Sequence, residues 1–283
     1  MKNFLLSLFF LFFTFLFAYS INVENKVVLN YQDVNKTFIN DQIHLSNTFY
    51  YELKIDDIKR LNYDTYYSFN FSLKNLVVGT DQNEDIINII RILTRGFKTR
   101  FTTDQNLNFI YSPNIEYLYL SDPLYQKYKE KIDKSSLNEF ANSVFYSFFD
   151  WFGKLKNKCH LELVEHSFDI YLSLFYYDSN YTTQLNIGKK GYKALVIKGQ
   201  GKVEKISKGE NLFNGLSIFS SNVSTYEYYD QQTLLPLLLQ REIMIRFDFN
   251  DPKMKQEYFK KYQKTYIDYK ITKTLMLIYS NNL

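Results

Sequence analysis

Residues 66–78 read YYSFNFSLKNLVV, and this stretch decides the fold class. From residue 67 to residue 74 its side chains alternate: Tyr67, Phe69, Phe71 and Leu73 share one parity, and Ser68, Asn70, Ser72 and Lys74 share the other. Successive side chains of a strand point to opposite sides, so one face would be apolar and the other wet. The stretch therefore predicts a long strand of an antiparallel sheet that buries one face.

The same alternation recurs through much of the chain. It predicts strands over residues 48–55, 97–101, 107–111, 115–120, 168–176, 192–196, 223–229, 233–239, 243–249 and 265–279. The 26 Tyr and 26 Phe suit the half-buried surface of a sheet. We therefore predict an α+β fold in which β structure dominates, built as a large curved antiparallel sheet (or sheets) or a half-barrel.

Three or four helices are expected, and two or three amphipathic ones among them should pack this sheet. Residues 81–95 lie between the N-cap candidates Asp81 and Asn83 and the terminator Gly96. Asp122 followed by proline predicts a short helix to about residue 133. Ser136 and Glu139 read as a capping box that opens an aromatic helix over 136–152. Asp251 followed by proline predicts a last helix to about 263.

The N-terminus predicts export. A lysine at position 2 precedes an apolar run over 4–17, and Ala18-Tyr19-Ser20 fits a signal peptidase site, so we place the cut after Ser20. The alternative is an uncleaved membrane anchor. Residues 21–283 are then expected to form a single large β-rich domain, with a weak subdivision near 154–160.

Cysteine use indicates the destination. Cys159 is the only cysteine, so an intramolecular disulfide is impossible, and none lies near the cut to carry a lipid anchor. An exported chain without disulfides favours a bacterial envelope, periplasmic or secreted, over a eukaryotic secretory pathway. An AT-rich protist origin stays open.

No catalytic, cofactor or metal-binding residues are predicted. The cluster His160, Glu162, Glu165 and His166 has metal-ligand character, but the two histidines would lie roughly 20 Å apart on one strand. Cys159 would need His44 or His166 as its base, because its neighbour His160 points to the other face. The pairs Gly188/Gly191 and Gly199/Gly201 lack the spacing of a phosphate loop. A net charge of +4 is too balanced to indicate nucleic acid.

The predicted last helix is basic as well as aromatic. Its lysines are Lys253, Lys255, Lys260, Lys261 and Lys264, beside Tyr258, Phe259 and Tyr262. Such a helix can lie on an anionic membrane surface. The sequence favours the other interpretation, in which the aromatic face packs on the sheet and the lysines lie in water.

Three functions follow from these patterns. The aromatic surplus favours a non-catalytic exported envelope protein that binds a lipid, another apolar ligand or a partner protein. An outer-membrane β-barrel is an alternative, although two amphipathic helices argue against it. An exported hydrolase is a second alternative, because residues distant in sequence can converge on one site.

Overall fold

A computed structural model describes residues 21–23, 26–61, 64–79, 84–105, 107, 109–110, 114–130, 132–151, 160–165, 170–206 and 215–281. The predicted signal peptide, Cys159, His166 and nearly all of the predicted subdivision near 154–160 lie outside these residues.

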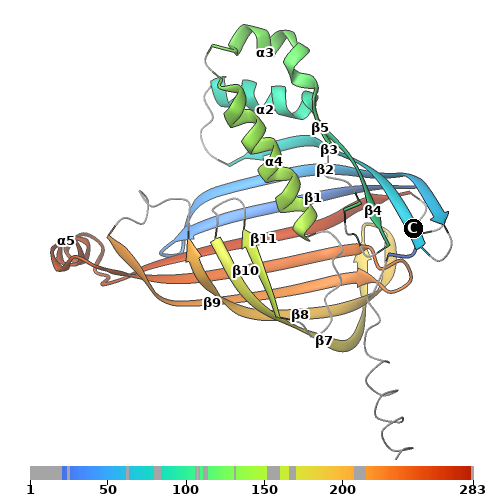
Figure 1. Ribbon diagram of the computed structural model, residues 1–283. Coiled ribbons are helices and arrows are strands. Elements are labelled where there is room, and N and C mark those ends of the chain that lie inside the picture. The colour runs from blue at the N-terminus through green and yellow to red at the C-terminus, as the bar shows by residue number, and fades with distance from the viewer. Residues whose placement is uncertain are drawn as a thin grey trace, which may run out of the picture.

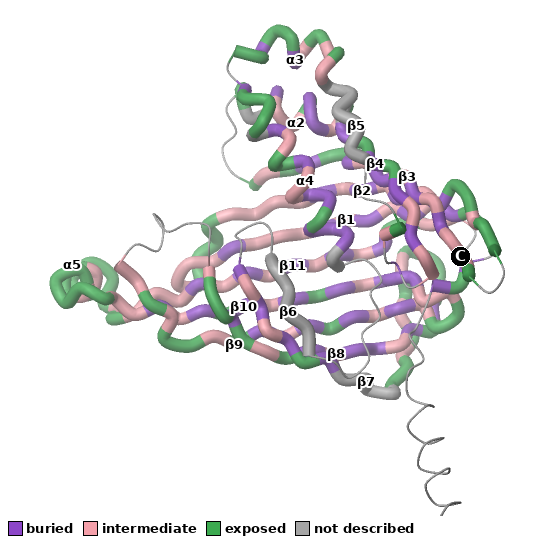
Figure 2. The backbone as a smooth tube through the Cα atoms, viewed as in Figure 1, coloured by how far each residue is buried: buried purple, intermediate pink, exposed green. Residues whose placement is uncertain are grey.

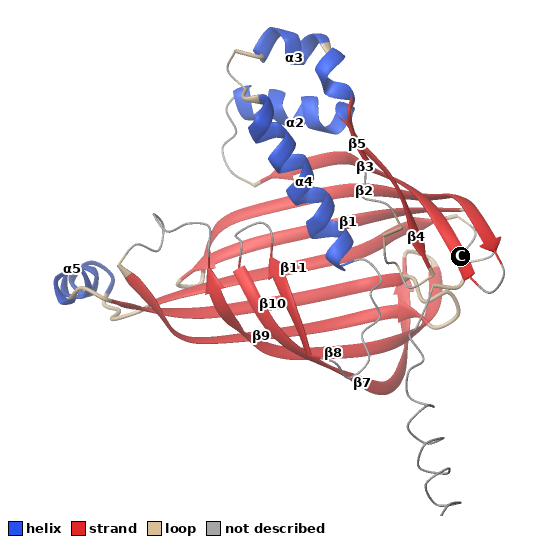
Figure 3. Ribbon diagram, in the orientation of Figure 1, coloured by secondary structure: helices blue, strands red, loops and turns tan. Residues whose placement is uncertain are grey.

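The described chain is dominated by strands of one sheet (Figures 1 and 3). The strands are β1 Val27–Ile39, β2 Gln42–Leu61, β3 Asp64–Val78, β4 Phe97–Asp104, β5 Asn114–Tyr117, β6 His160–Glu165, β7 Ile170–Ile187, β8 Lys190–Ile206, β9 Leu216–Asp230, β10 Pro236–Phe249 and β11 Ile267–Ser280. Their order is β5-β4-β3-β2-β1-β11-β10-β9-β8-β7-β6, and every pairing is antiparallel. The predicted β-dominant fold with a large open antiparallel sheet is confirmed.

The sheet is curved into a trough, as Figure 1 shows. Its inner face is buried in strict alternation: along β11, Tyr269, Ile271, Lys273, Leu275 and Leu277 are all buried. The curl brings β7 into contact with β11, although three strands separate them in the sheet order. Side chains of the inner face therefore meet across the trough and form its core.

One end of the trough is tied by the first described residues. The Ile21 amide donates to the Gln105 carbonyl (3.2 Å), and the Asn22 amide donates to that of Thr233 in the β9–β10 turn (2.8 Å). Tyr67 of β3 donates its hydroxyl to the Ile21 carbonyl. Segment 21–23 thus joins the two halves of the sheet at the end opposite α5.

Few helices accompany the sheet. They are α2 Glu84–Gly96, the 3-10 turn η1 Leu118–Ser121, α3 Pro123–Tyr128, α4 Lys134–Trp151 and α5 Pro252–Tyr262. α2 and α3 gather beyond β3, α4 crosses the inner face, and α5 projects from one end of the sheet (Figure 1).

Several predicted boundaries were wrong. α4 begins at Lys134, so Ser136 lies within the helix and is not its cap. α3 stops at Tyr128, although Asp122 caps it as predicted, accepting from the Leu124 amide at 2.7 Å. Residues 118–121 form η1 rather than strand. In the predicted strand 107–111, Phe109 makes only an isolated bridge to Thr103.

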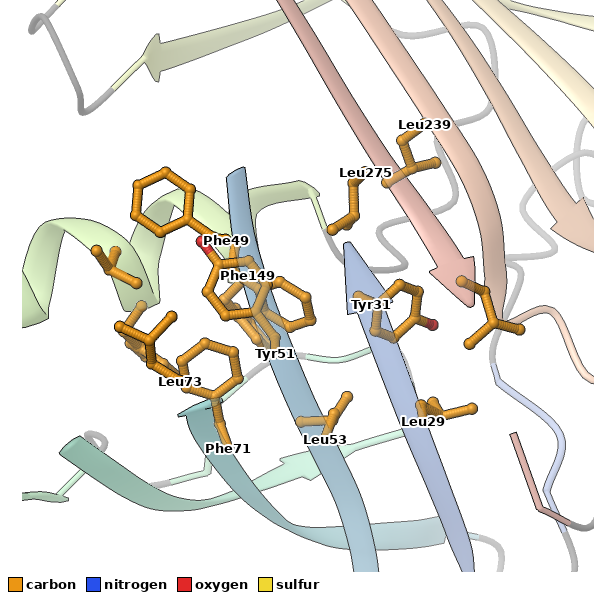
Figure 4. Close-up of a cluster of buried hydrophobic side chains, with 14 of the residues drawn as sticks. Leu29, Tyr31, Phe49, Tyr51, Leu53, Phe71, Leu73, Phe149, Leu239 and Leu275 are labelled. Carbon is orange, nitrogen blue, oxygen red and sulfur yellow. The ribbon is translucent and has the colours of Figure 1, made fainter. Parts of the chain in front are cut away.

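The aromatic core lies under α4. The Phe148 ring is 4.8 Å from the ring of Phe71, 4.9 Å from Tyr51 and 5.6 Å from Tyr31, on three neighbouring strands. Figure 4 shows Tyr51 and Phe71 gathered with Phe149 of the same helix. Edge-on and tilted ring pairs of this kind each add about 0.5 to 1.5 kcal/mol beyond area burial.

Candidate functional site

A hollow of about 210 Å³ lies beside α4, on the side of the helix that carries Ser143, Val144 and Ser147. Its apolar lining comes from Leu45, Phe49, Tyr51, Phe140, Val144 and Ile271. Its polar lining comes from Asp33, Asn35, Thr37, Asn47, Ser143 and Ser147. The hollow exceeds the ~150 Å³ cavities that hold a benzene molecule. It is large enough for part of an organic ligand, and its lining is amphipathic.

A row of polar side chains crosses the floor of the trough. Cα partners place Asn47 of β2, Asn35 of β1, Lys273 of β11, Arg241 of β10 and Thr225 of β9 in one line. These positions all have inward parity on their strands. Inward positions of a sheet are normally apolar, because burying a polar group costs free energy unless it is hydrogen-bonded. Five adjacent strands share this exception.

Ionisable groups of both signs are buried on this floor. Lys273 and Arg241 carry positive charge, Asp33 and Glu227 carry negative charge, and all four are at most 5% exposed. The Lys273 ammonium donates to Ser147 Oγ and so links β11 to α4. The floor is therefore balanced in charge and attached to the helix that covers it.

Glu227 is also held by hydroxyl groups. Tyr229 donates its hydroxyl to the Glu227 carboxylate at 2.6 Å, and Thr225 donates at 3.3 Å. Burial, and then the nearby Glu227 carboxylate, raise the pKa of Tyr229 well above its ordinary value. Tyr229 therefore stays neutral and serves as a donor.

Asn47 has a buried acceptor atom that is not hydrogen-bonded to any described residue. Its Oδ1 is buried and meets no hydrogen-bond partner among the described residues. A buried acceptor without a partner costs about 1 to 3 kcal/mol. Because Asn47 lines the hollow, a bound molecule with a hydroxyl or amide group could satisfy this atom.

A second hollow, of about 510 Å³, continues the first along the strands toward α5. It is lined mainly by Ile39, Ile43, Leu216, Tyr258, Tyr262, Ile267 and Tyr269, together with Asn40, Gln42, His44 and Lys264. Thr37 and Ile271 line the first hollow, and the next inward residues of the same strands, Ile39 and Tyr269, line the second. The two hollows therefore follow one face of β1 and β11.

Tyr269 and Thr37 stand between the two hollows. The Tyr269 hydroxyl is hydrogen-bonded to the Thr37 side chain. Burial raises the pKa of Tyr269 to about 12, and the Thr37 bond acts in the opposite direction. At neutral pH this pair is an uncharged constriction in the trough.

Of the residues that the sequence offered for chemistry, Cys159 and His166 lie outside the described part of the chain. His44 lines the second hollow, while β6 places His160 opposite Phe175 of β7 and Glu162 opposite Ser173, near a sheet edge. Within the described ranges, no group of three His, Cys, Asp or Glu side chains could hold a metal ion. None of the described helices is long and apolar enough to cross a membrane.

The second of the two glycine pairs has a structural explanation. Gly199 and Gly201 lie within β8, where a Cβ at Gly201 would sit 1.9 Å from the Ser173 carbonyl oxygen of β7. A Cβ at Gly199 would sit 2.5 Å from the Thr225 methyl group. These positions need glycine for close approach of neighbouring strands.

Sequence analysis missed a strand that supplies three polar side chains of the first hollow, Asp33, Asn35 and Thr37. β1 was not predicted, and β2 was expected to begin only at residue 48. Asp33, Asn35 and Thr37 occupy inward positions of β1, so its apolar alternation stops there. A signal did exist in the first half, where Val27, Leu29 and Tyr31 alternate correctly.

Comparisons with known proteins give no family. No family model matches the chain, and no curated protein matches it. The structure is similar to that of lipovitellin, solved for its lipid–protein interactions, with a TM-score of 0.47 and 9% identity over 92% of this chain and 26% of that one. The chain therefore spans about a quarter of lipovitellin. A Bacteroides fragilis protein of YmcC-like fold gives a TM-score of 0.34 and 10% identity over 94% of this chain and all of the other. With TM-scores below 0.5, neither likeness assigns a ligand.

Proposed function

We propose that this chain is an exported, non-catalytic protein that binds a single-chain amphipathic lipid in the hollow beside α4. One observation carries the proposal: the hollow combines an aromatic and aliphatic wall with the polar side chains of Asp33, Asn35, Thr37, Asn47, Ser143 and Ser147. Ligand sites are typically apolar concavities with a few polar groups that fix orientation.

The lining suggests how such a ligand would lie. Its polar group would donate to the buried Oδ1 of Asn47, close to Asn35. Its apolar part would lie against Phe49, Tyr51 and Val144. A longer chain would pass the Tyr269–Thr37 constriction into the second hollow, whose lining is largely apolar.

A small ligand fits the hollow better than a protein partner does. Specific protein interfaces bury about 800 Å² on each partner, and a concavity of about 210 Å³ roofed by a helix offers no such area. A single acyl chain with one polar group matches its size and its mixed lining.

The test fills the hollow with a larger side chain. Ser143 lines the hollow from α4, and we expect Ser143→Trp to abolish binding of dansyl-undecanoic acid, measured by its fluorescence. Glu139→Trp places the same side chain on an exposed part of α4 that does not line the hollow, and it should bind as the wild type does. Competition with lysophospholipids and fatty acids would then show which polar group the hollow binds more tightly.

Two results would overturn the proposal. One is wild-type protein that binds no single-chain probe and gives a ligand-free native mass spectrum after expression in its host. The other is equal binding by the Ser143→Trp and Glu139→Trp variants, which would place the ligand elsewhere. Unfolding curves of both variants would show that each still folds.

A further inference from the structure

α5 leaves most of its apolar face uncovered. Met254 is 40% exposed, Phe259 43% and Tyr262 49%, and no residue of the helix is buried. Figure 2 shows the helix almost wholly in the colour of exposed residues, at the end of the sheet. The sequence alternative in which the aromatic face packs on the sheet holds for Tyr258, whose ring lies against Phe249 at the end of β10.

The helix is nevertheless held in a fixed position. The Tyr258 ring lies 5.0 Å from that of Phe249 at the end of β10, and its hydroxyl accepts from Asn40 in the β1–β2 turn. Asp251 caps the first turn by accepting from the Lys253 amide at 2.8 Å, and Gln263 closes the last turn in the left-handed conformation. The exposed residues therefore belong to an ordered surface.

Positive charge surrounds these apolar side chains. Residues 252–264 contain five lysines and one glutamate. Lys255 is paired with Asp248, whereas Lys253, Lys260 and Lys261 lie on the exposed part of the helix. The Lys261 ammonium stands 4.9 Å from the ring centre of Tyr262. Lysine stems can lie along an apolar surface while their charges reach anionic groups above it.

We infer that α5 docks this protein on an anionic bilayer, with Phe259 and Tyr262 inserted among the lipid headgroups and Lys260 and Lys261 against lipid phosphates. A short basic helix with an aromatic face binds in the membrane interface, and its affinity grows with buried apolar area and with anionic lipid. The start of β2 adds Ile43, which is 60% exposed and lines the second hollow together with Tyr262. Docking here would bring the open end of the trough to the lipid.

This inference does not depend on what the hollow beside α4 binds, because it concerns a different surface. Vesicle binding tests it directly. The wild-type protein should float with vesicles of phosphatidylcholine and phosphatidylglycerol, should not float with pure phosphatidylcholine, and should detach as salt is raised. Lys260→Glu with Lys261→Glu should lower the partition coefficient at least about thirtyfold, and Phe259→Ala should lower it about tenfold.

A matched control lies at the opposite end of the sheet. Lys189→Glu with Lys190→Glu makes the same change in charge at the β7–β8 turn and should leave vesicle binding within about twofold of wild type. Phe259→Trp adds a fluorescent reporter of the environment of α5, and Trp151 is the single tryptophan of the wild-type chain. Its emission should shift to the blue on anionic vesicles only.

Three outcomes would overturn the inference. The first is wild-type protein that stays unbound on anionic vesicles. The second is equal loss of binding by the α5 and the β7–β8 charge reversals, which would indicate attraction by overall charge. The third is a concentration-dependent dimer, seen by light scattering and removed by Phe259→Ala, which would assign the face to a second copy of the chain.

Discussion

The two flanks of α4 face the same sheet but are built for different purposes. On one flank Phe145, Phe148 and Phe149 are at most 1% exposed and lie against rings of several strands. On the other flank Ser143, Val144 and Ser147 border the hollow. One helix thus closes the core on one side and leaves space beside its polar residues on the other.

This difference separates what holds the fold from what serves a ligand. Interiors are close-packed, and the loss of a large buried side chain leaves a void whose lining loses contacts. Residues that already border a hollow have fewer such contacts to lose. The two flanks should therefore respond differently to the same kind of substitution.

The largest effect is expected from Phe148→Ala on the packed flank. The ring meets Tyr31, Tyr51 and Phe71, so its removal should lower the free energy of unfolding by about 3 to 5 kcal/mol. Val144→Ala on the hollow flank should cost about 1 to 2 kcal/mol, the transfer free energy of two methyl groups. Urea unfolding of both variants measures this; equal losses would show that the flanks do not differ in packing.

A smaller effect is expected where the hollow flank contacts the floor. Ser147 accepts a hydrogen bond from the buried ammonium of Lys273, and hydrogen bonds to charged groups contribute about 1.5 to 3 kcal/mol. Ser147→Ala should destabilise the protein by that amount. Ser143→Ala, one turn earlier on the same flank, should change stability by less than about 0.5 kcal/mol. A neutral Ser147→Ala would mean that the Lys273 contact does not hold α4 in place.

Burial of Tyr269 at the constriction between the hollows should make the free energy of unfolding depend on pH. Tyr269 titrates near 12 in the folded chain and near 10 when unfolded, so its contribution is complete below pH 10 and is lost as pH rises toward 12. At pH 11 the loss is about 1.4 kcal/mol. Between pH 8 and pH 11 the free energy of unfolding should therefore fall by about 1.4 kcal/mol less in Tyr269→Phe than in the wild type. Unfolding curves at both pH values measure it, and equal losses would place Tyr269 in contact with water.

Much of the sheet could be predicted from sequence, because most inward positions are apolar. Residues 66–78 read as a strand on alternation alone, and β3 covers them. The prediction failed where inward positions are polar. Residues 233–239 and 243–249 were read as two strands, yet β10 runs through Arg241 without a break. Its neighbour in the polar row, Lys273, was included in the predicted strand 265–279 only because strongly apolar residues flank it.

The site could not be predicted for the same reason. Asn35, Asn47 and Thr225 are unremarkable in sequence, and only the register of β2, β1, β11, β10 and β9 brings them into one row. Register depends on long-range pairing that a single sequence does not show. The basic and aromatic residues of α5 were evident in the sequence. Their exposure could not be predicted, because it depends on the direction in which the helix projects from the end of β10.

The smallest expected effect on stability comes from the residue that should matter most for the ligand. Asn47→Leu removes a buried acceptor that meets no partner among the described residues, so unfolding free energy should stay equal or rise by about 1 kcal/mol. The same substitution should weaken binding of a hydroxyl-bearing single-chain lipid about tenfold, since its donor loses an acceptor. Thr48→Val, the next residue on the other face of β2, is the control and should leave binding unchanged. A stability loss for Asn47→Leu without any loss of binding would make Asn47 part of the fold and not of the site.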